Sequence, residues 1–228
     1  MSFLSSQRKE LLKAAGLTTR SLSKPCTIKV VETHQELEQI LNVRFVAYKV
    51  AAKILADATS EMMEDEYDAS SIIYCAKYGS DVIATMRANI SKSDGQKFPF
   101  ERYFGSCESL GISRHNTCEI SRLAILPEFQ GSDLFIGFVK VTVQMLVKLG
   151  LDTMFCVATN KLAAMYQRIG AERMSEPVLH PVLIDESFSL YRIKTSSLLT
   201  GSNIAFEVWK KISEEAINHL IYHGFLRQ

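Results

Sequence analysis

Several charged side chains, which lie within apolar helix and strand patterns or in one acidic loop, could together support acid–base chemistry. They are Arg44, Asp65, Asp68, Arg87, Glu119 and Arg122. A carboxylate can accept the proton that an amine must lose before it attacks an acyl carbon. An unpaired charge is costly to bury, so buried arginines need carboxylate partners. We therefore predict a mainly architectural ion network in which Asp65 and Asp68 pair with the arginines and which can also face a substrate. Taken singly, each residue also fits an ordinary surface position or a structural ion pair.

One segment, Cys118 to Ala171, contains the elements that would position Glu119 and Arg122. Its prolines and glycines divide it into a strand, a turn, a long buried helix, a second strand and a short helix. The expected bounds are 118–126, 127–131, 134–148, 152–158 and 160–169, in that order. Gly131 can adopt a positive φ in the turn, and Asn160 is a candidate N-cap of the last helix.

A helix that begins at the capping box of Thr33 and Glu36 carries Arg44. Arg44 lies within an apolar stripe at helical spacing, whose other members are Leu37, Ile40, Leu41, Phe45, Tyr48, Ala52 and Leu55. The acidic loop 64–68 follows soon afterwards in the chain. This loop offers the carboxylate that a buried Arg44 needs.

Turn residues and alternating apolar positions place the remaining elements. We expect strands over 26–32, 71–78, 81–91 and 188–193, a hairpin turn at Gly79-Ser80, and a C-terminal amphipathic helix over 201–225. Arg87 lies on the second strand of the hairpin. Residues 92–117 form a long, irregular excursion that is rich in aromatic residues. A loop of this length inside a compact domain is expected to pack over something.

Composition excludes several classes of function. The 228 residues carry a net charge of +1 without a basic run, which argues against nucleic-acid binding. No apolar segment is long enough to be a transmembrane segment, and the N-terminus lacks the apolar core of a signal peptide. The five cysteines are scattered and have no metal-ligand spacing. We therefore expect reduced thiols, no metal site and a cytoplasmic protein.

The order of these elements resembles the GNAT superfamily of N-acyltransferases. The short helix expected over 160–169 adds to the resemblance through Asn160, Tyr166 and the Gly170 that follows it. Shorter motifs resemble the acyl-homoserine lactone (AHL) or autoinducer synthases, and equally the long-chain N-acyl amino acid synthases. These motifs, between about residues 40 and 171, are Val43-Arg44-Phe45, Asp65-Glu66-Tyr67-Asp68-Ala69, Thr85-Met86-Arg87 and Glu119-Ile120-Ser121-Arg122. The resemblance implies an α/β (α+β) GNAT-like fold with a mixed, mostly antiparallel central sheet flanked by helices. This domain would span 25–200, with a helical extension over 1–24 and a C-terminal helix within 201–228.

The resemblance also implies a reaction, the direct attack of an amine on a thioester. Glu119 would act as the general base, directly or through water, and a strand N–H would hold the thioester carbonyl. Tyr166 would donate to the departing thiolate, or would pack on the pantetheine arm of the donor. Asn160 would bond to the pantetheine amides, or would cap its helix. The donor-binding backbone would be that of Leu123, Ala124, Ile125, Gln130, Gly131 and Ser132.

Two departures from the family patterns bear on the choice of substrates. Asp133 and Phe135 stand where the GNAT turn has small residues, and an aspartate there would oppose the diphosphate of coenzyme A. Acyl carrier protein (ACP) is therefore favoured over acyl-CoA as donor and partner, and no cofactor would be tightly bound. The tryptophan that AHL synthases place after the first-helix arginine is absent. We expect transfer of a medium or long acyl chain to the amine of an amino acid.

The alternatives are AHL synthesis from S-adenosylmethionine, acetyl transfer from acetyl-CoA, and non-catalytic acyl binding. Acetyl transfer is disfavoured, because the turn that would bind the diphosphate of acetyl-CoA departs from the GNAT pattern at Asp133 and Phe135. An apolar tunnel for the acyl chain is possible, although core packing is the simpler interpretation for its candidates Phe135, Phe138, Met145, Met154, Phe155 and Met165. The C-terminal helix would seal the sheet or form a homodimer contact.

Overall fold

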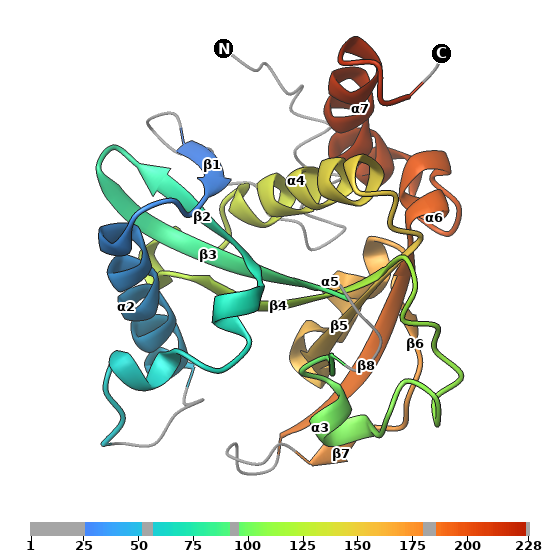
Figure 1. Ribbon diagram of the computed structural model, residues 1–228. Coiled ribbons are helices and arrows are strands. Elements are labelled where there is room, and N and C mark those ends of the chain that lie inside the picture. The colour runs from blue at the N-terminus through green and yellow to red at the C-terminus, as the bar shows by residue number, and fades with distance from the viewer. Residues whose placement is uncertain (1–25, 52–56, 92–95, 180–185, 227–228) are drawn as a thin grey trace.

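The computed structural model describes residues 26–51, 57–91, 96–179 and 186–226. They build an eight-stranded sheet of order β1-β2-β3-β4-β5-β8-β6, and β7 pairs with β8 outside this path (Figure 1). The strands are β1 (Cys26–Val30), β2 (Ile72–Tyr78), β3 (Asp81–Ile90), β4 (Thr117–Ile125), β5 (Thr153–Thr159), β6 (Glu172–Arg173), β7 (Val178–Leu179) and β8 (Ser187–Lys194). Neighbouring strands are antiparallel except for β4 and β5. The predicted extension over 1–24 lies outside the described residues.

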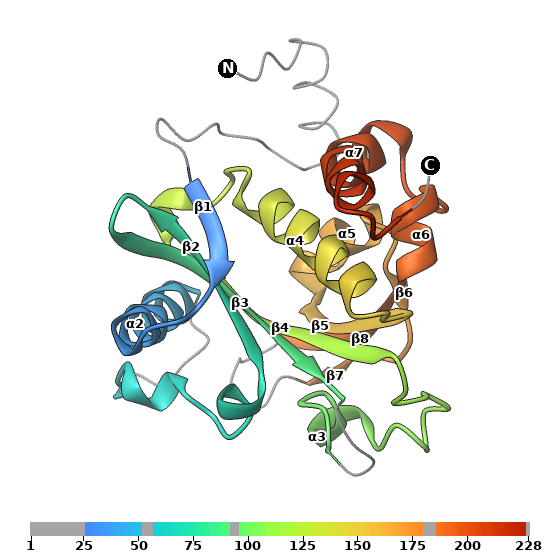
Figure 2. The same ribbon diagram turned by 45° about the horizontal axis from the view of Figure 1, so that its top comes forward.

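Helices cover both faces of this sheet (Figure 2). They are α2 (His34–Val50), α3 (Glu101–Phe104), α4 (Leu134–Lys148), α5 (Asn160–Arg168), α6 (Thr195–Thr200) and α7 (Phe206–Tyr222), with 3-10 turns at Glu61–Met63, Asp68–Ser70 and Pro127–Phe129. α2 packs on one face through a buried cluster that it forms with β2 and β3. α4 packs on the other face, and α7 lies against α4. The predicted mixed, mostly antiparallel sheet flanked by helices is confirmed.

Local signals explain the elements at the centre of the fold. β2 and β3 are joined by Gly79 and Ser80, and Gly79 has a φ of 68°, which suits a two-residue hairpin turn. α4 is apolar on nearly every side because the sheet covers one of its sides and α7 covers another. It ends at Lys148, and Gly150 leaves the helix with a φ of 63°.

β4 and β5 separate part-way along their length (Figure 1). They pair in parallel as far as Ile120 and Cys156. Beyond that point β4 continues beside β3, and β5 continues beside β8. A β-bulge in β4 accompanies the separation, because Arg122 and Leu123 together stand opposite Met86, and Arg122 has a φ of 54°. The result is a wedge in which one edge of β4 is open to a ligand.

The described part of the 92–117 excursion packs against the sheet, as predicted. Phe98 and Phe100 are buried in a cluster with Phe155 and Leu190 of the sheet. The rings of Phe98 and Phe100 are stacked at a centroid distance of 5.5 Å. This packing brings α3 next to the wedge between β4 and β5.

Two predicted helix details are wrong. Ile40 and Arg44 of the predicted stripe are buried, but Leu41 and Phe45 are only partly buried, because the buried face is rotated toward Glu36, Val43 and Ala47. The end of the predicted stripe, at Ala52 and Leu55, lies outside the described residues. α7 begins at Phe206 rather than at Gly201, because Gly201 has a φ of 77° and closes α6.

Within the described ranges no helix is long and apolar enough to cross a membrane. In the same ranges, no group of three or more His, Cys, Asp or Glu side chains is placed to hold a metal ion. The five cysteines are free thiols.

Candidate active site

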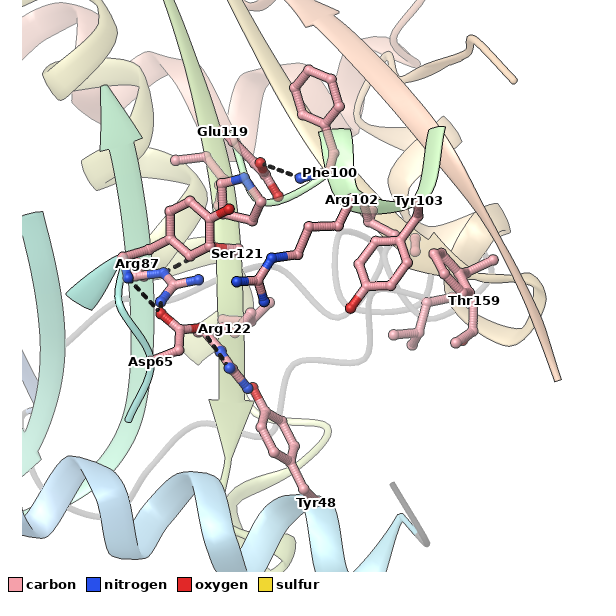
Figure 3. A pocket seen from close by; sticks show the side chains of 18 of the residues that line it. Tyr48, Asp65, Arg87, Phe100, Arg102, Tyr103, Glu119, Ser121, Arg122 and Thr159 are labelled. Atoms are coloured by element: carbon pink, nitrogen blue, oxygen red, sulfur yellow. Dashed lines mark hydrogen bonds and ion pairs between the residues drawn. The ribbon is translucent and has the colours of Figure 1, made fainter. Parts of the chain in front are cut away.

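A cavity of about 440 Å³ opens in the wedge between β4 and β5 (Figure 3). Its lining residues are Tyr48, Met62, Met63, Asp65, Tyr67, Arg87, Pro99, Phe100, Arg102, Tyr103, Glu119, Ile120, Ser121, Arg122, Leu123, Val157, Ala158, Thr159, Leu162, Tyr166 and Phe188. They come from α2, the 3-10 turn Glu61–Met63, the acidic loop, the α3 segment, the strands β3, β4, β5 and β8, and α5. The fold therefore gathers segments that are far apart in the sequence around one cavity.

A buried ion network lies along the side of the cavity that faces α2. Arg44 is fully buried and pairs with Asp68 through Nη1–Oδ2 at 2.8 Å and Nη2–Oδ1 at 2.9 Å. Arg87 donates to Asp68 at 3.1 Å and also to Asp65. Arg122 Nη2 donates to Asp65 at 2.6 Å. The predicted pairs are present in the structure, whereas their role toward a substrate stays a prediction.

The network ties the acidic loop to both α2 and the sheet. Arg44 and Asp68 lie behind the cavity wall, whereas Asp65, Arg87 and Arg122 line the cavity. Burial opposes ionisation of Asp65, but hydrogen bonds from Arg122 and Arg87 outweigh it and lower the pKa of Asp65 to about 2. Asp65 is therefore a fixed negative charge between two arginines, and is not placed to carry protons near neutral pH.

Glu119 is the buried carboxyl of the cavity. It is 2% exposed, and its Oε2 accepts a hydrogen bond of 2.9 Å from the backbone N–H of Phe100. Burial raises the pKa of Glu119 to about 8, and the Phe100 hydrogen bond and the charge of Arg87 offset this only in part. A carboxyl with this pKa can take up and release a proton close to neutral pH, as a general base must.

The part of β4 that was predicted to bind the pantetheine arm is only partly in the cavity. Leu123 lines it, but Ala124 is 3% exposed and packs with α2 on the other side of the sheet. The backbone carbonyl of Ile125 accepts a hydrogen bond of 3.2 Å from Gln130 Nε2, so one of its lone pairs is occupied. Among these three residues, the geometry places Leu123 best for contact with a ligand in the cavity.

The predicted phosphate-binding turn lies outside the cavity, directly before α4. Gly131 has the expected positive φ, 73°. Ser132 is buried, and its Oγ accepts a hydrogen bond of 3.4 Å from the backbone N–H of Leu134. With Gln130 bonded back to Ile125, the three turn residues are held by contacts within their own segment.

Asn160 opens α5 but does not cap it, so the N-cap prediction is wrong. The N-cap position is Thr159, which makes no side-chain capping hydrogen bond. The Asn160 Nδ2 instead donates to Ser187 Oγ at 2.7 Å, because β8 begins beside the start of α5. Asn160 lies outside the cavity lining, whereas Thr159 is part of it.

Tyr166 projects from α5 to the cavity and is 9% exposed. Its ring meets that of Phe135 edge-to-face at a centroid distance of 6.0 Å. Burial raises the pKa of Tyr166 well above the ordinary value for a phenol. The hydroxyl therefore stays protonated and can donate a hydrogen bond, but it is a poor source of a whole proton.

Sequence reasoning missed the aromatic and cationic wall made by Tyr67, Arg102, Tyr103 and Phe188. The aromatic residues of the 92–117 excursion were the signal in the sequence from which part of this wall could have been predicted. The candidate tunnel residues do not line the cavity, so the core interpretation fits better: Phe138, Met145, Met154 and Phe155 are buried in hydrophobic clusters, and Phe135 and Met165 pack against one.

The sequence model of the family described as N-acyl amino acid synthase FeeM matches residues 39–194. The chain belongs to the FeeM family. It is therefore an N-acyltransferase, and the matched range contains every residue of the ion network together with Glu119 and Tyr166. No curated protein sequence matches the chain.

Solved structures share the fold of this FeeM family member. FeeM, an N-acyl amino acid synthase from uncultured soil microbes, aligns with a TM-score of 0.58 at 10% identity, over 75% of this chain and 93% of FeeM. The CoA-dependent acyl-homoserine lactone synthase BjaI aligns with a TM-score of 0.62 at 11% identity, over 84% of this chain and 90% of BjaI. The AHL synthase LasI aligns with a TM-score of 0.62 at 16% identity, over 84% of this chain and 96% of LasI. A protein of the GNAT family from Desulfovibrio desulfuricans aligns with a TM-score of 0.53 at 12% identity, over 75% of this chain and 99% of that chain, which confirms the GNAT-like fold.

Proposed function

We propose that the protein transfers a medium or long acyl chain from acyl carrier protein to the α-amine of an amino acid. The observation that carries the proposal is the cavity in the wedge of β4 and β5, where the buried carboxyl of Glu119 lies among arginines. Membership of the FeeM family supports acyl transfer to an amine. The cavity lining has three arginines, Arg87, Arg102 and Arg122, against the ionised Asp65, which supports an acceptor that carries a carboxylate.

Glu119 would supply the base for the attack. In its ionised form it takes a proton from the acceptor nitrogen as that nitrogen bonds to the thioester carbon. The carbon–sulfur bond then breaks, and the products are an amide and a free thiol. The net proton transfer is from nitrogen to sulfur, with Glu119 as the carrier.

The open edge of β4 would hold the thioester. Beyond Ile120 this edge is not paired with β5, so backbone N–H groups around Leu123 are available to the thioester oxygen and the pantetheine amides. Tyr166 lines the same cavity, and its hydroxyl would donate a hydrogen bond to the departing sulfur. Holding donor and acceptor in one cavity lowers the entropic cost of bringing them together.

The start of α4 supports acyl carrier protein as the donor. Asp133 is the N-cap residue of α4 and follows the turn of Gln130, Gly131 and Ser132 directly. A carboxylate at this position repels the diphosphate of coenzyme A more than the single phosphodiester of a carrier protein. Turnover measured with acyl-ACP and acyl-CoA of one chain length tests this preference. Equal affinity and turnover with both donors would contradict it.

Mass spectrometry of organic extracts tests the reaction itself. Bacteria that express the protein are compared with bacteria that express Glu119→Gln. New N-acyl amino acids that are absent from the variant would support the proposal and identify the acceptor. AHLs in their place would assign the protein to lactone synthesis from S-adenosylmethionine. No new acylated amine in either extract would leave acetyl transfer or acyl binding, and purified protein would then be assayed with acetyl-CoA.

A further inference from the structure

The arginines of the cavity differ in how firmly they are neutralised. The side chain of Arg87 is 2% exposed and donates to Asp65, which also binds Arg122. Arg102, in contrast, is 48% exposed and pairs with Glu66, which is 61% exposed. Exposed ion pairs contribute little to stability and exchange partners readily. The guanidinium of Arg102 is therefore the cation of the cavity that a ligand can engage at least cost.

Arg102 is also aimed into the cavity. Figure 3 shows its side chain reaching from α3 across the cavity toward Asp65 and Arg122. Its guanidinium carbon lies 5.0 Å from the centroid of the Tyr67 ring. The ring supports one face of the planar group, so its N–H edge, which now binds Glu66, can form two parallel hydrogen bonds with a carboxylate that replaces Glu66.

The α3 segment links Arg102 to the base. Phe100, two residues before Arg102, donates its backbone N–H to Glu119. Glu101 fixes the segment, because it accepts hydrogen bonds of 2.8 and 2.6 Å from the two Nη atoms of Arg114. The amine and the carboxylate of an α-amino acid are joined through a single carbon. A carboxylate bound to Arg102 would therefore keep the amine in the cavity that Glu119 lines.

We infer that Arg102 binds the carboxylate of the amino acid acceptor, and that Glu66 competes for Arg102 in the free enzyme. The inference rests on the proposed function. Glu66 is a carboxylate of the chain itself, and the carboxylate of the acceptor replaces it on the guanidinium. Glu66 thereby sets how tightly the acceptor binds without touching it.

Steady-state kinetics test this with acyl-ACP as donor, each of the twenty L-amino acids as acceptor, and the carboxamide of the best one. For the amino acid, Arg102→Gln should raise KM about 30-fold, because a bidentate, charge-assisted contact is lost. Its kcat should change by less than about threefold, because Arg102 takes no part in proton transfer. Arg102→Lys should lie between Arg102→Gln and wild type, since it keeps the charge but loses the fork.

Glu66→Gln should have the opposite effect on the KM for the amino acid and lower it by roughly two- to fivefold, because it removes the carboxylate that competes weakly for Arg102. For the carboxamide, Arg102→Gln and wild type should have the same KM. Arg173→Gln is the matched control, because Arg173 is an exposed arginine on β6. Melting temperatures of all variants separate lost binding from lost folding.

An unchanged KM for the amino acid in Arg102→Gln would overturn the inference, as would a raised KM in Glu66→Gln. In that case wild type still acylates amino acids and the proposed function stands. A wild-type enzyme that acylates no amino acid would overturn the proposed function and this inference together.

Discussion

Glu119 is shielded from water, and Arg87, whose charge acts on it, is already paired with Asp65 and Asp68. Burial therefore keeps the pKa of Glu119 at about 8. We expect Glu119→Gln to lower kcat by about 10²- to 10⁴-fold, because glutamine can still accept the hydrogen bond from Phe100 but cannot accept a proton. Release of free thiol from acyl-ACP, followed colorimetrically, measures the change.

Glu38→Gln is a suitable control for this variant, because Glu38 is 66% exposed on α2. It should turn over at the wild-type rate. A Glu119→Gln enzyme with wild-type kcat and an unchanged melting temperature would exclude Glu119 from proton transfer.

Tyr166 is expected to act through a hydrogen bond, because burial keeps its pKa far above that of a thiol. Tyr166→Phe should lower kcat by about tenfold with an alkyl thioester, since a neutral hydrogen bond to the departing sulfur is lost. The loss should shrink with an aryl thioester, whose thiolate departs without help. Rates with the two thioesters measure the difference. An equal loss with both would indicate that Tyr166 only packs against the donor.

Single residues differ in how far the sequence predicts their position. Arg44 was predictable, because an arginine within an apolar helix stripe needs a carboxylate, and Asp68 supplies it. The position of Arg102 was not predictable, because Arg102 lies in the short helix α3, whose place depends on the pair of Glu101 and Arg114. The capping role of Asn160 was predicted wrongly, because its hydrogen-bond partner Ser187 lies on β8, which is far away in the sequence.

The buried ion pair of Arg44 and Asp68 holds α2 in position beside the sheet. Arg44→Met should lower the free energy of unfolding by about 3 to 5 kcal/mol, because Asp68 is left buried with one fewer cation. Urea denaturation monitored by circular dichroism measures this. Lys49→Met, at an exposed position of the same helix, should change stability little. An Arg44→Met protein as stable as wild type would show that Asp68 is adequately paired by Arg87 alone.

Elements with a strong local signal agree with their predicted bounds. α4 spans Leu134–Lys148 as predicted, because an apolar run of 15 residues between turn residues is too long for a typical strand and favours a buried helix. The separation of β4 from β5 was not predictable from pattern. It accompanies a bulge at Arg122, where a residue other than glycine takes a positive φ, and no turn residue marks the position. The cavity at this separation could therefore be inferred only from family resemblance.

The whole molecule assembles its cavity from segments between Tyr48 and Phe188 of the sequence. No short stretch of the sequence contains the site, so the set of residues that line the cavity could not be derived from local periodicity. The order of motifs along the chain carried more information, because in a given fold that order determines which segments meet. This is why Glu119, Arg87 and Tyr166, which line the cavity, were among the predicted site residues, whereas the wall of Tyr67, Arg102, Tyr103 and Phe188 was not predicted.

The stability of the whole molecule should depend on pH through Glu119 and Asp65. The pKa of Asp65 is lowered to about 2, so its contribution is present above its ordinary pKa and is lost as pH falls toward 2. The pKa of Glu119 is raised from 4.5 to about 8, so the folded protein keeps a proton that the unfolded chain releases above 4.5. The stability from Glu119 is therefore fully present below pH 4.5 and is lost as pH rises to about 8.

At roughly 1.4 kcal/mol per pH unit, the loss from Glu119 amounts to roughly 4 to 5 kcal/mol between these limits. Urea denaturation at pH 5, 7 and 9 should thus show wild type losing stability toward alkaline pH. Glu119→Gln should lose much less, because its amide does not ionise. The gap in stability between the variant and wild type should grow with pH, and a constant gap would contradict the raised pKa. Since the ionised form of Glu119 is the one that accepts a proton, the conditions that favour catalysis are those in which the fold is less stable.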